Sequence, residues 1–142
     1  MVIIKMTIEE LKEKANAKPA RKRPAYLEDK LQIACKYWFD LQYPKLKLLL
    51  HHSPNEGLLM RHDRDGAKRK AMGMRAGFPD FIFLHPNKFY GYLALELKSA
   101  KGRQTDNQKQ YQQAVEQNGG KYIIVRTLDE FISEVNSYIN EF

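Results

Sequence analysis

The stretch that decides the fold reads Gly77-Phe-Pro-Asp80-Phe-Ile-Phe-Leu84 and continues, after a short interval, with Tyr92-Leu-Ala-Leu-Glu96-Leu-Lys98. The interval carries Pro, Asn and Gly, the residue types that mark a turn. The two apolar runs are therefore predicted to be neighbouring strands of a hairpin. If the chain folds back at Lys88, Asp80 and Glu96 each lie eight residues from that point and face each other across the strand pair.

Two carboxylates and one lysine are expected to meet at one place on this hairpin. Side chains alternate between the faces of a strand, so Glu96 and Lys98 share a face. Asp80 and Glu96 bring two negative charges for the one positive charge of Lys98, and buried charge is costly unless it is paired or binds a metal. A buried ion pair between Glu96 and Lys98 is the structural alternative. Carboxylate oxygens suit Mg²⁺ or Mn²⁺, so the hairpin is predicted to hold a metal.

These residues resemble the signature of the PD-(D/E)XK nuclease superfamily, in which Asp80 would be followed by Glu96-Leu-Lys98. The longer form, Met72-Gly-Met-Arg-Ala-Gly-Phe-Pro-Asp80 with a downstream Gln108, is similar to the VRR-NUC subfamily. The resemblance covers most of the chain. It implies an α/β fold of the restriction-endonuclease-like type, an αβββαβ core whose mixed central sheet is flanked by helices.

The resemblance also implies roles for the charged residues of the hairpin. Asp80 and Glu96 would bind Mg²⁺, for which Mn²⁺ can substitute, together with the main-chain carbonyl of Leu97. Lys98 would orient or deprotonate the attacking water and stabilise the charge that builds up on the phosphate, and both roles stay open. A lysine at a strand end that reaches solvent is the simpler interpretation.

Two further residues are assigned to the catalytic site by resemblance. Glu28 lies in the first turn of a predicted helix, on the same side as Leu31 and Cys35, and the family commonly points a glutamate of its first helix at the metal. An interaction with the helix dipole alone is the alternative for Glu28. Gln108 is expected both to complete a capping box with Thr105 and to support the site.

The sequence predicts an order of helix, three strands, helix, strand and helix after an N-terminal appendage. Residues 1–25 are predicted to form a short helix, opened by a capping box at Thr7, and a basic linker, whereas residues 26–142 form the nuclease domain. Apolar spacing and turn residues give the remaining elements. They are a helix from residue 26 to before Pro44, strands at 46–52, 78–84, 92–98 and 121–126, a short helical turn at 67–72, and helices at 105–117 and 128–139.

Composition limits the class of protein. The 142 residues suffice for one domain, and 43% hydrophobic content argues for a folded chain. The single Cys35 excludes an intrachain disulfide and a cysteine-rich zinc site, which fits a reducing, cytoplasmic location. No apolar run approaches the length of a membrane span. The glycines lack the Gly-Lys-Ser/Thr ending of a phosphate-binding loop, so use of a nucleoside triphosphate is not expected.

A formal net charge of +7 favours an anionic partner. Cations gather before the hairpin and just after it, and we expect them to contact the phosphate backbone of nucleic acid. Residues 18–23 carry further positive charge, for which a solvated linker is the favoured interpretation and a phosphate-binding arm the alternative. The predicted nucleic-acid-binding residues are Arg61, Arg64, Lys68, Arg69, Lys70, Arg75, Lys101 and Arg103.

These features together predict a metal-dependent DNA endonuclease. The resemblance implies a stand-alone, phage-type enzyme that acts as a homodimer on branched DNA, especially four-way (Holliday) junctions. The aromatic residues available for an interface are Tyr37, Trp38, Tyr43, Phe89, Tyr90 and Tyr92, and packing in the core is the alternative for Trp38. The alternatives are a non-catalytic nucleic-acid-binding accessory protein, a monomeric nickase and a nuclease that acts on RNA.

Overall fold

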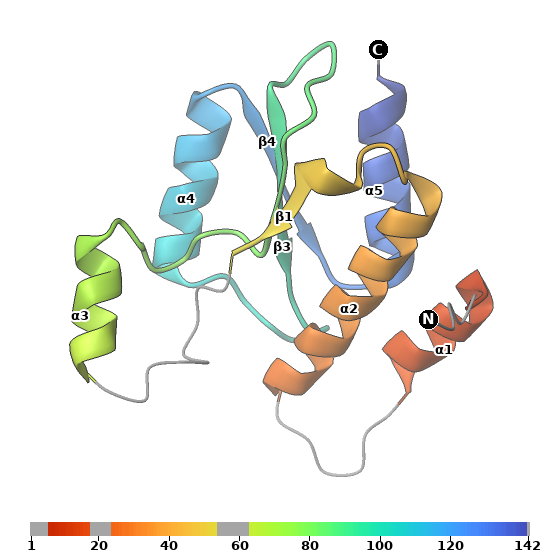
Figure 1. Cartoon of the computed structure of the whole chain (residues 1–142), viewed down its shortest axis with the longest axis horizontal. Coiled ribbons are helices and arrows are strands. Elements are labelled where there is room, and N and C mark those ends of the chain that lie inside the picture. Colours follow the sequence, from red (N-terminus) through yellow and green to blue (C-terminus); the bar gives the residue numbers. More distant parts are fainter. Residues whose placement is uncertain (1–5, 18–23, 54–62, 142) are drawn as a thin grey trace.

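The structure, a computed structural model, describes residues 6–17, 24–53 and 63–141. A four-stranded sheet is covered by helices on both faces, with α4 on one face and α2 and α5 on the other (Figure 1). The elements are α1 (Ile8–Asn16), α2 (Pro24–Gln42), β1 (Leu50–His52), α3 (Asp63–Ala71), β2 (Phe81–Phe83), β3 (Tyr92–Leu97), α4 (Asp106–Gln117), β4 (Gly120–Val125) and α5 (Leu128–Asn140). The predicted αβββαβ order is therefore confirmed, with α3 inserted between β1 and β2.

The strands lie in the order β1-β2-β3-β4. The first two pairs are antiparallel, whereas β3 and β4 are parallel because α4 forms the crossover between them. In the hairpin Phe81 pairs with Leu95 and Phe83 with Leu93, which is the register of a fold-back at Lys88. This register places Asp80 opposite Glu96, as predicted.

Side-chain alternation divides the sheet into two faces. Phe81, Phe83, Leu93 and Leu95 enter the main core beneath α2 and α5 and are at most 1% exposed. The opposite face carries a smaller cluster of Ala94 with residues of α4 and β4. Because Glu96 is two residues from Ala94, it points to this second face, beside α4. None of the helices in the described ranges is long and apolar enough to cross a bilayer.

Several sequence predictions about the first strand and the core are wrong. The strand predicted at 46–52 is only Leu50–His52, because the chain turns after Pro44 and forms a short 3₁₀ helix at Lys47–Leu49. Leu41 shares the helical spacing of Leu31 and Trp38, which predicts a buried position, but it is 48% exposed. Among the aromatic residues considered for an interface, Trp38 is buried in the core and Tyr43 and Tyr90 pack against it. Phe89 is 65% exposed and Tyr92 packs on the opposite face of the sheet, so the use of aromatic residues in an interface stays a prediction.

The N-terminal helix α1 contacts the body of the molecule (Figure 1). Its predicted capping box is present, since the Thr7 side chain accepts from the Glu10 amide and the Glu10 side chain accepts from the Thr7 amide. Leu11 is buried in the main core, and Lys12 forms an ion pair with Asp129 of α5. The domain boundary at residue 25 stays a prediction.

Candidate active site

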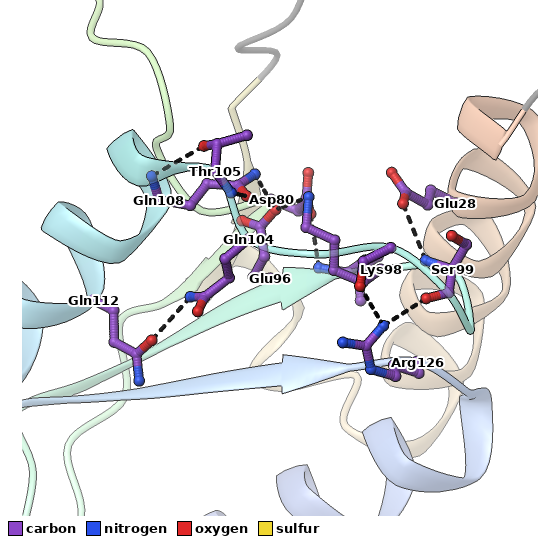
Figure 2. Close-up of polar contacts among 12 residues, drawn as sticks. Glu28, Asp80, Glu96, Lys98, Ser99, Gln104, Thr105, Gln108, Gln112 and Arg126 are labelled. Carbon is purple, nitrogen blue, oxygen red and sulfur yellow. Dashed lines mark hydrogen bonds and ion pairs between the residues drawn. The ribbon is translucent and has the colours of Figure 1, made fainter.

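Residues from four elements converge at the end of the hairpin that lies opposite its turn (Figure 2). Asp80 precedes β2, Glu96 lies near the end of β3, and Lys98 follows that strand. Gln108 comes from the first turn of α4, and Glu28 from the first part of α2. The structure thus brings together the five side chains that were predicted as catalytic.

Glu96 is the centre of this cluster. Its carboxylate accepts a hydrogen bond from Gln108 Nε2 at 2.6 Å and lies 3.3 Å from Lys98 Nζ, with both contacts made by Oε1. Glu96 is 2% exposed and Lys98 8% exposed. A buried ion pair gains little over apolar packing, because desolvation offsets most of the attraction between the two charges. Fold stability alone therefore does not explain these two residues.

Asp80 is held beside the Glu96–Lys98 ion pair by a hydrogen bond from the main chain of β3. Its Oδ2 accepts from the Leu97 amide at 2.7 Å, which ties the start of β2 to the end of β3. Burial raises the pKa of the Asp80 carboxyl, and the nearby Glu28 raises it further, while the Leu97 amide, His52 and Lys98 lower it. Burial is the largest of these effects, so the ionised carboxylate is held at a cost. A cation at the site would relieve that cost.

Gln108 has two functions, as predicted. Its Oε1 accepts from the Thr105 amide at 2.9 Å, which completes the capping box at the start of α4, and its Nε2 donates to Glu96. Gly77 packs closely against the start of α4. It has a positive φ of 82°, and a Cβ there would lie 2.7 Å from main-chain and side-chain atoms of Asn107. Only glycine fits, so the loop before Asp80 is docked on α4.

Glu28 faces the site but contacts the loop that follows β3 (Figure 2). Its Oε1 accepts a hydrogen bond from the Ser99 amide at 3.0 Å. Since Ser99 directly follows Lys98, this contact anchors the lysine's main chain to α2. The choice of Glu28 over Asp29 agrees with exposure, because Glu28 is half-buried whereas Asp29 is exposed.

Three residues near the site were not identified as contributors from the sequence. Arg126, at the end of β4, donates from Nη1 to the carbonyl oxygens of Ser99 and Gly102 at 2.6 and 2.7 Å. His52 Nδ1 lies 2.7 Å from the Asp80 carbonyl oxygen and therefore donates to it. Tyr122 is buried on the Glu96 face of the sheet, and burial together with the Glu96 charge raises the pKa of its phenol. The parallel β3–β4 pairing positions Tyr122 and Arg126, and it is a long-range feature that strand patterns do not specify.

The donor set fits a hard divalent cation. Mg²⁺ in proteins commonly takes one or two carboxylates and keeps several waters. Asp80 and Glu96 supply two carboxylates, and the Leu97 carbonyl is the third predicted ligand. Within the described ranges no cluster of three or more His, Cys, Asp or Glu side chains forms a closed metal site. A site of this composition suits Mg²⁺ or Mn²⁺ better than Zn²⁺, which prefers nitrogen and sulfur ligands.

The predicted nucleic-acid-binding cations whose side chains the structure describes lie outside the cluster. Lys68, Lys70 and Arg75 are exposed on or just after α3, which lies at the edge of the molecule (Figure 1). Lys101 and Arg103 are exposed in the loop after β3. Arg69 is half-buried. Arg61 falls outside the described residues, as does the side chain of Arg64, so their predicted roles stay predictions.

Comparisons with known proteins agree on one family. The model of the VRR-NUC domain matches residues 12–128. A solved structure described as a VRR_NUC domain protein is 27% identical in sequence, superimposes with a TM-score of 0.71, and is aligned over 86% of this chain and 93% of its own. No curated protein matches the sequence.

Proposed function

The chain belongs to the VRR-NUC domain family, a family of PD-(D/E)XK-like nucleases, and from this premise we propose that it is a metal-dependent DNA endonuclease. The observation that carries the proposal is the buried contact of Glu96 with Lys98 and Gln108, next to a carboxyl of Asp80 whose ionised form is destabilised. A protein that only binds nucleic acid gains nothing from bringing these charges together. A nuclease needs them for hydrolysis of a phosphodiester bond.

Asp80, Glu96 and the Leu97 carbonyl would hold Mg²⁺ or Mn²⁺. Such an ion supplies a Lewis acid for the scissile phosphate and makes a water more acidic. The protein's own contribution is to fix the ligands: the Leu97 amide orients Asp80, and Gln108 orients Glu96. These two hydrogen bonds would hold both carboxylates in place before the metal binds.

Lys98 would act on the phosphate and the attacking water. Its ammonium is held at the site by Glu96, and its main-chain amide donates to Val125 of β4 at 2.9 Å. A fixed positive charge stabilises the extra negative charge of the transition state without having to reorganise. Glu28 would serve the site mainly through Ser99, the residue after Lys98.

The substrate is proposed to be DNA with branches, cut by a homodimer. One chain supplies one set of Asp80, Glu96 and Lys98, and cutting two strands in a coordinated way needs two sets, most simply from a twofold dimer.

Exposed cations on α3 and after β3 would contact phosphates. Reversal of Arg69 and Lys70 to glutamate should weaken binding to all DNAs alike and flatten its salt dependence, measured by fluorescence anisotropy.

The test is cleavage of end-labelled substrates by the purified protein. Single-stranded, duplex, flap and four-way-junction DNA, together with single-stranded and duplex RNA, are incubated with Mg²⁺, Mn²⁺ or EDTA. We expect metal-dependent cleavage that is fastest on the four-way junction, and a dimer by light scattering. Cleavage of RNA alone would show that the protein is an RNA nuclease. Single nicks in plain duplex DNA by a monomer would show that it is a nickase and not a junction-cutting dimer. Binding with no cleavage in either metal would contradict the nuclease itself.

A further inference from the structure

Arg126 makes two short hydrogen bonds at the edge of the site, although it contacts none of the predicted ligands. It directly follows Val125, the last residue of β4, which accepts the hydrogen bond from the Lys98 amide. The guanidinium is half-buried, and its Nη1 donates to Ser99 O and Gly102 O (Figure 2). Hydrogen bonds from a charged donor are about twice as strong as neutral ones.

The two acceptors are the ends of one tight turn. Residues 99–102 form a turn closed by a 3.0 Å hydrogen bond from the Gly102 amide to the Ser99 carbonyl. The Ser99 amide donates in turn to Glu28. The turn therefore links Lys98, which precedes it, to Glu28 on α2 and to Arg126 directly after β4.

Part of this turn borders solvent and is not covered by other elements. A hollow of about 310 Å³ lies beside it, lined by Ser99, Ala100 and Arg126 together with residues of α1 and α2. Ala100 and Lys101 are exposed. With solvent on these sides, the hydrogen bonds from Arg126 and to Glu28 tie the turn to its neighbours.

The turn also touches the catalytic groups directly. A Cβ added to Gly102 would lie 3.4 Å from Lys98 Cδ, 3.3 Å from Glu28 Oε1 and 3.0 Å from Ser99 Oγ. The main chain of the turn is thus closely fitted against the lysine stem and the glutamate. Any shift of the turn moves the surface on which Lys98 lies.

We infer that Arg126 is a positioning residue, which clamps the turn at residues 99–102 and thereby sets the positions of Lys98 and Glu28. The inference rests on the proposed nuclease function. Misplacement of a reacting group by about 1 Å can cost on the order of 100-fold in rate. Loss of the clamp should therefore reduce turnover while leaving metal and DNA binding in place.

The test compares Arg126→Ala and Arg126→Lys with wild type, and with Lys36→Ala as the matched control. Lys36 is an exposed cation of α2 paired with Asp40 and is remote from the turn in sequence. In Arg126→Ala we expect kcat to fall about 10- to 100-fold with KM changed less than about twofold, and Arg126→Lys to recover part of the loss. Hydrogen exchange of the Ser99 and Gly102 amides should quicken by more than that of amides in the β3–β4 pair, which report global unfolding.

Each outcome decides the inference. Wild-type kcat in Arg126→Ala, or unchanged exchange at the two amides, would overturn it. A rise in KM with unchanged kcat would make Arg126 a DNA contact instead. If Arg126→Ala fails to fold, Gly102→Ala is the second variant, because its methyl group crowds Ser99, Glu28 and Lys98 and should also lower kcat. If wild type does not cleave at all, the proposed function fails, and the exchange measurement still shows separately whether the clamp exists.

Discussion

The β2–β3 hairpin has polar residues at both ends, and the two ends satisfy them in different ways. At the turn, Asn87 Oδ1 accepts from the amides of Phe89 and Tyr90 at 2.9 and 2.8 Å, and its Nδ2 donates to the Tyr138 carbonyl of α5 at 3.0 Å. Polar groups are satisfied there by close neighbours in sequence and by hydrogen bonds to α5 and the residue that follows it. These hydrogen bonds stabilise the turn and its packing on α5.

At the other end, like charges are brought together by residues far apart in the chain. Asp80 and Glu96 lie side by side, with Gln108, Glu28 and Arg126 contributed by three other elements. Burial destabilises the ionised form of Asp80 rather than stabilising it. The difference teaches that the turn end supports the fold, whereas the other end carries a cost to the fold that the proposed metal site would explain.

The strongest way to separate the two ends is to neutralise the charged residues. Asp80→Asn, Glu96→Gln and Lys98→Ala should each reduce cleavage by about 1000-fold or more, because each removes a metal ligand or the fixed positive charge. Their effects should not add, since the groups act as a unit. Single-turnover cleavage measures the loss, with Asp129→Asn, an exposed carboxylate on α5, as control. Wild-type rates in the three variants would show that the chemistry lies elsewhere.

Gln108 joins fold and function, so its replacement should affect both. Gln108→Ala removes the donor to Glu96 and one half of the capping box, and we expect about a 10- to 100-fold loss of activity and about 1 kcal/mol of stability. Gln112→Ala, one turn further along α4, is the matched control because the Gln112 amide accepts from Gln104 and donates to Glu116, outside the cluster. Equal effects of the two changes would contradict the role of Gln108.

The reverse pattern is expected at the turn. Asn87→Ala leaves the Phe89 and Tyr90 amides without their acceptor and should lower the free energy of unfolding by about 1 to 2 kcal/mol, measured by urea denaturation. The turnover of the folded enzyme should stay unchanged. A loss of kcat comparable with that of Gln108→Ala would mean that the two ends of the hairpin are coupled.

The smallest expected effect is a gain in stability. Because burial raises the folded-state pKa of Asp80, the folded protein keeps this proton to higher pH than the unfolded chain, and stability falls as pH rises above the ordinary aspartate value. In EDTA at neutral pH, Asp80→Asn should therefore melt a few degrees higher than wild type. Added Mg²⁺ should stabilise wild type alone. A lower melting temperature of the variant in EDTA would contradict this sign.

The features that the sequence predicted correctly depend on contacts between residues close together in the chain, and those that it missed depend on contacts between distant residues. Periodicity and turn residues gave the hairpin register, because Asp80 and Glu96 are positioned by a local fold-back. Capping chemistry gave Gln108 for the same reason. The first strand was predicted too long, since Leu46 and Leu48 were assigned to a sheet although Leu48 is 88% exposed. Arg126 was missed because its role depends on the parallel β3–β4 pairing, which brings residues 99 and 126 together.

The most direct measurement of the central claim is Mn²⁺ binding without DNA, followed by electron paramagnetic resonance. The comparison uses wild type, Asp80→Asn, Glu96→Gln and, for the other end of the hairpin, Asn87→Ala. We predict that wild type and Asn87→Ala bind the ion alike and that either carboxylate variant loses at least about 10-fold in affinity. Equal Mn²⁺ affinity in all four proteins would contradict the assignment of Asp80 and Glu96 as the metal site.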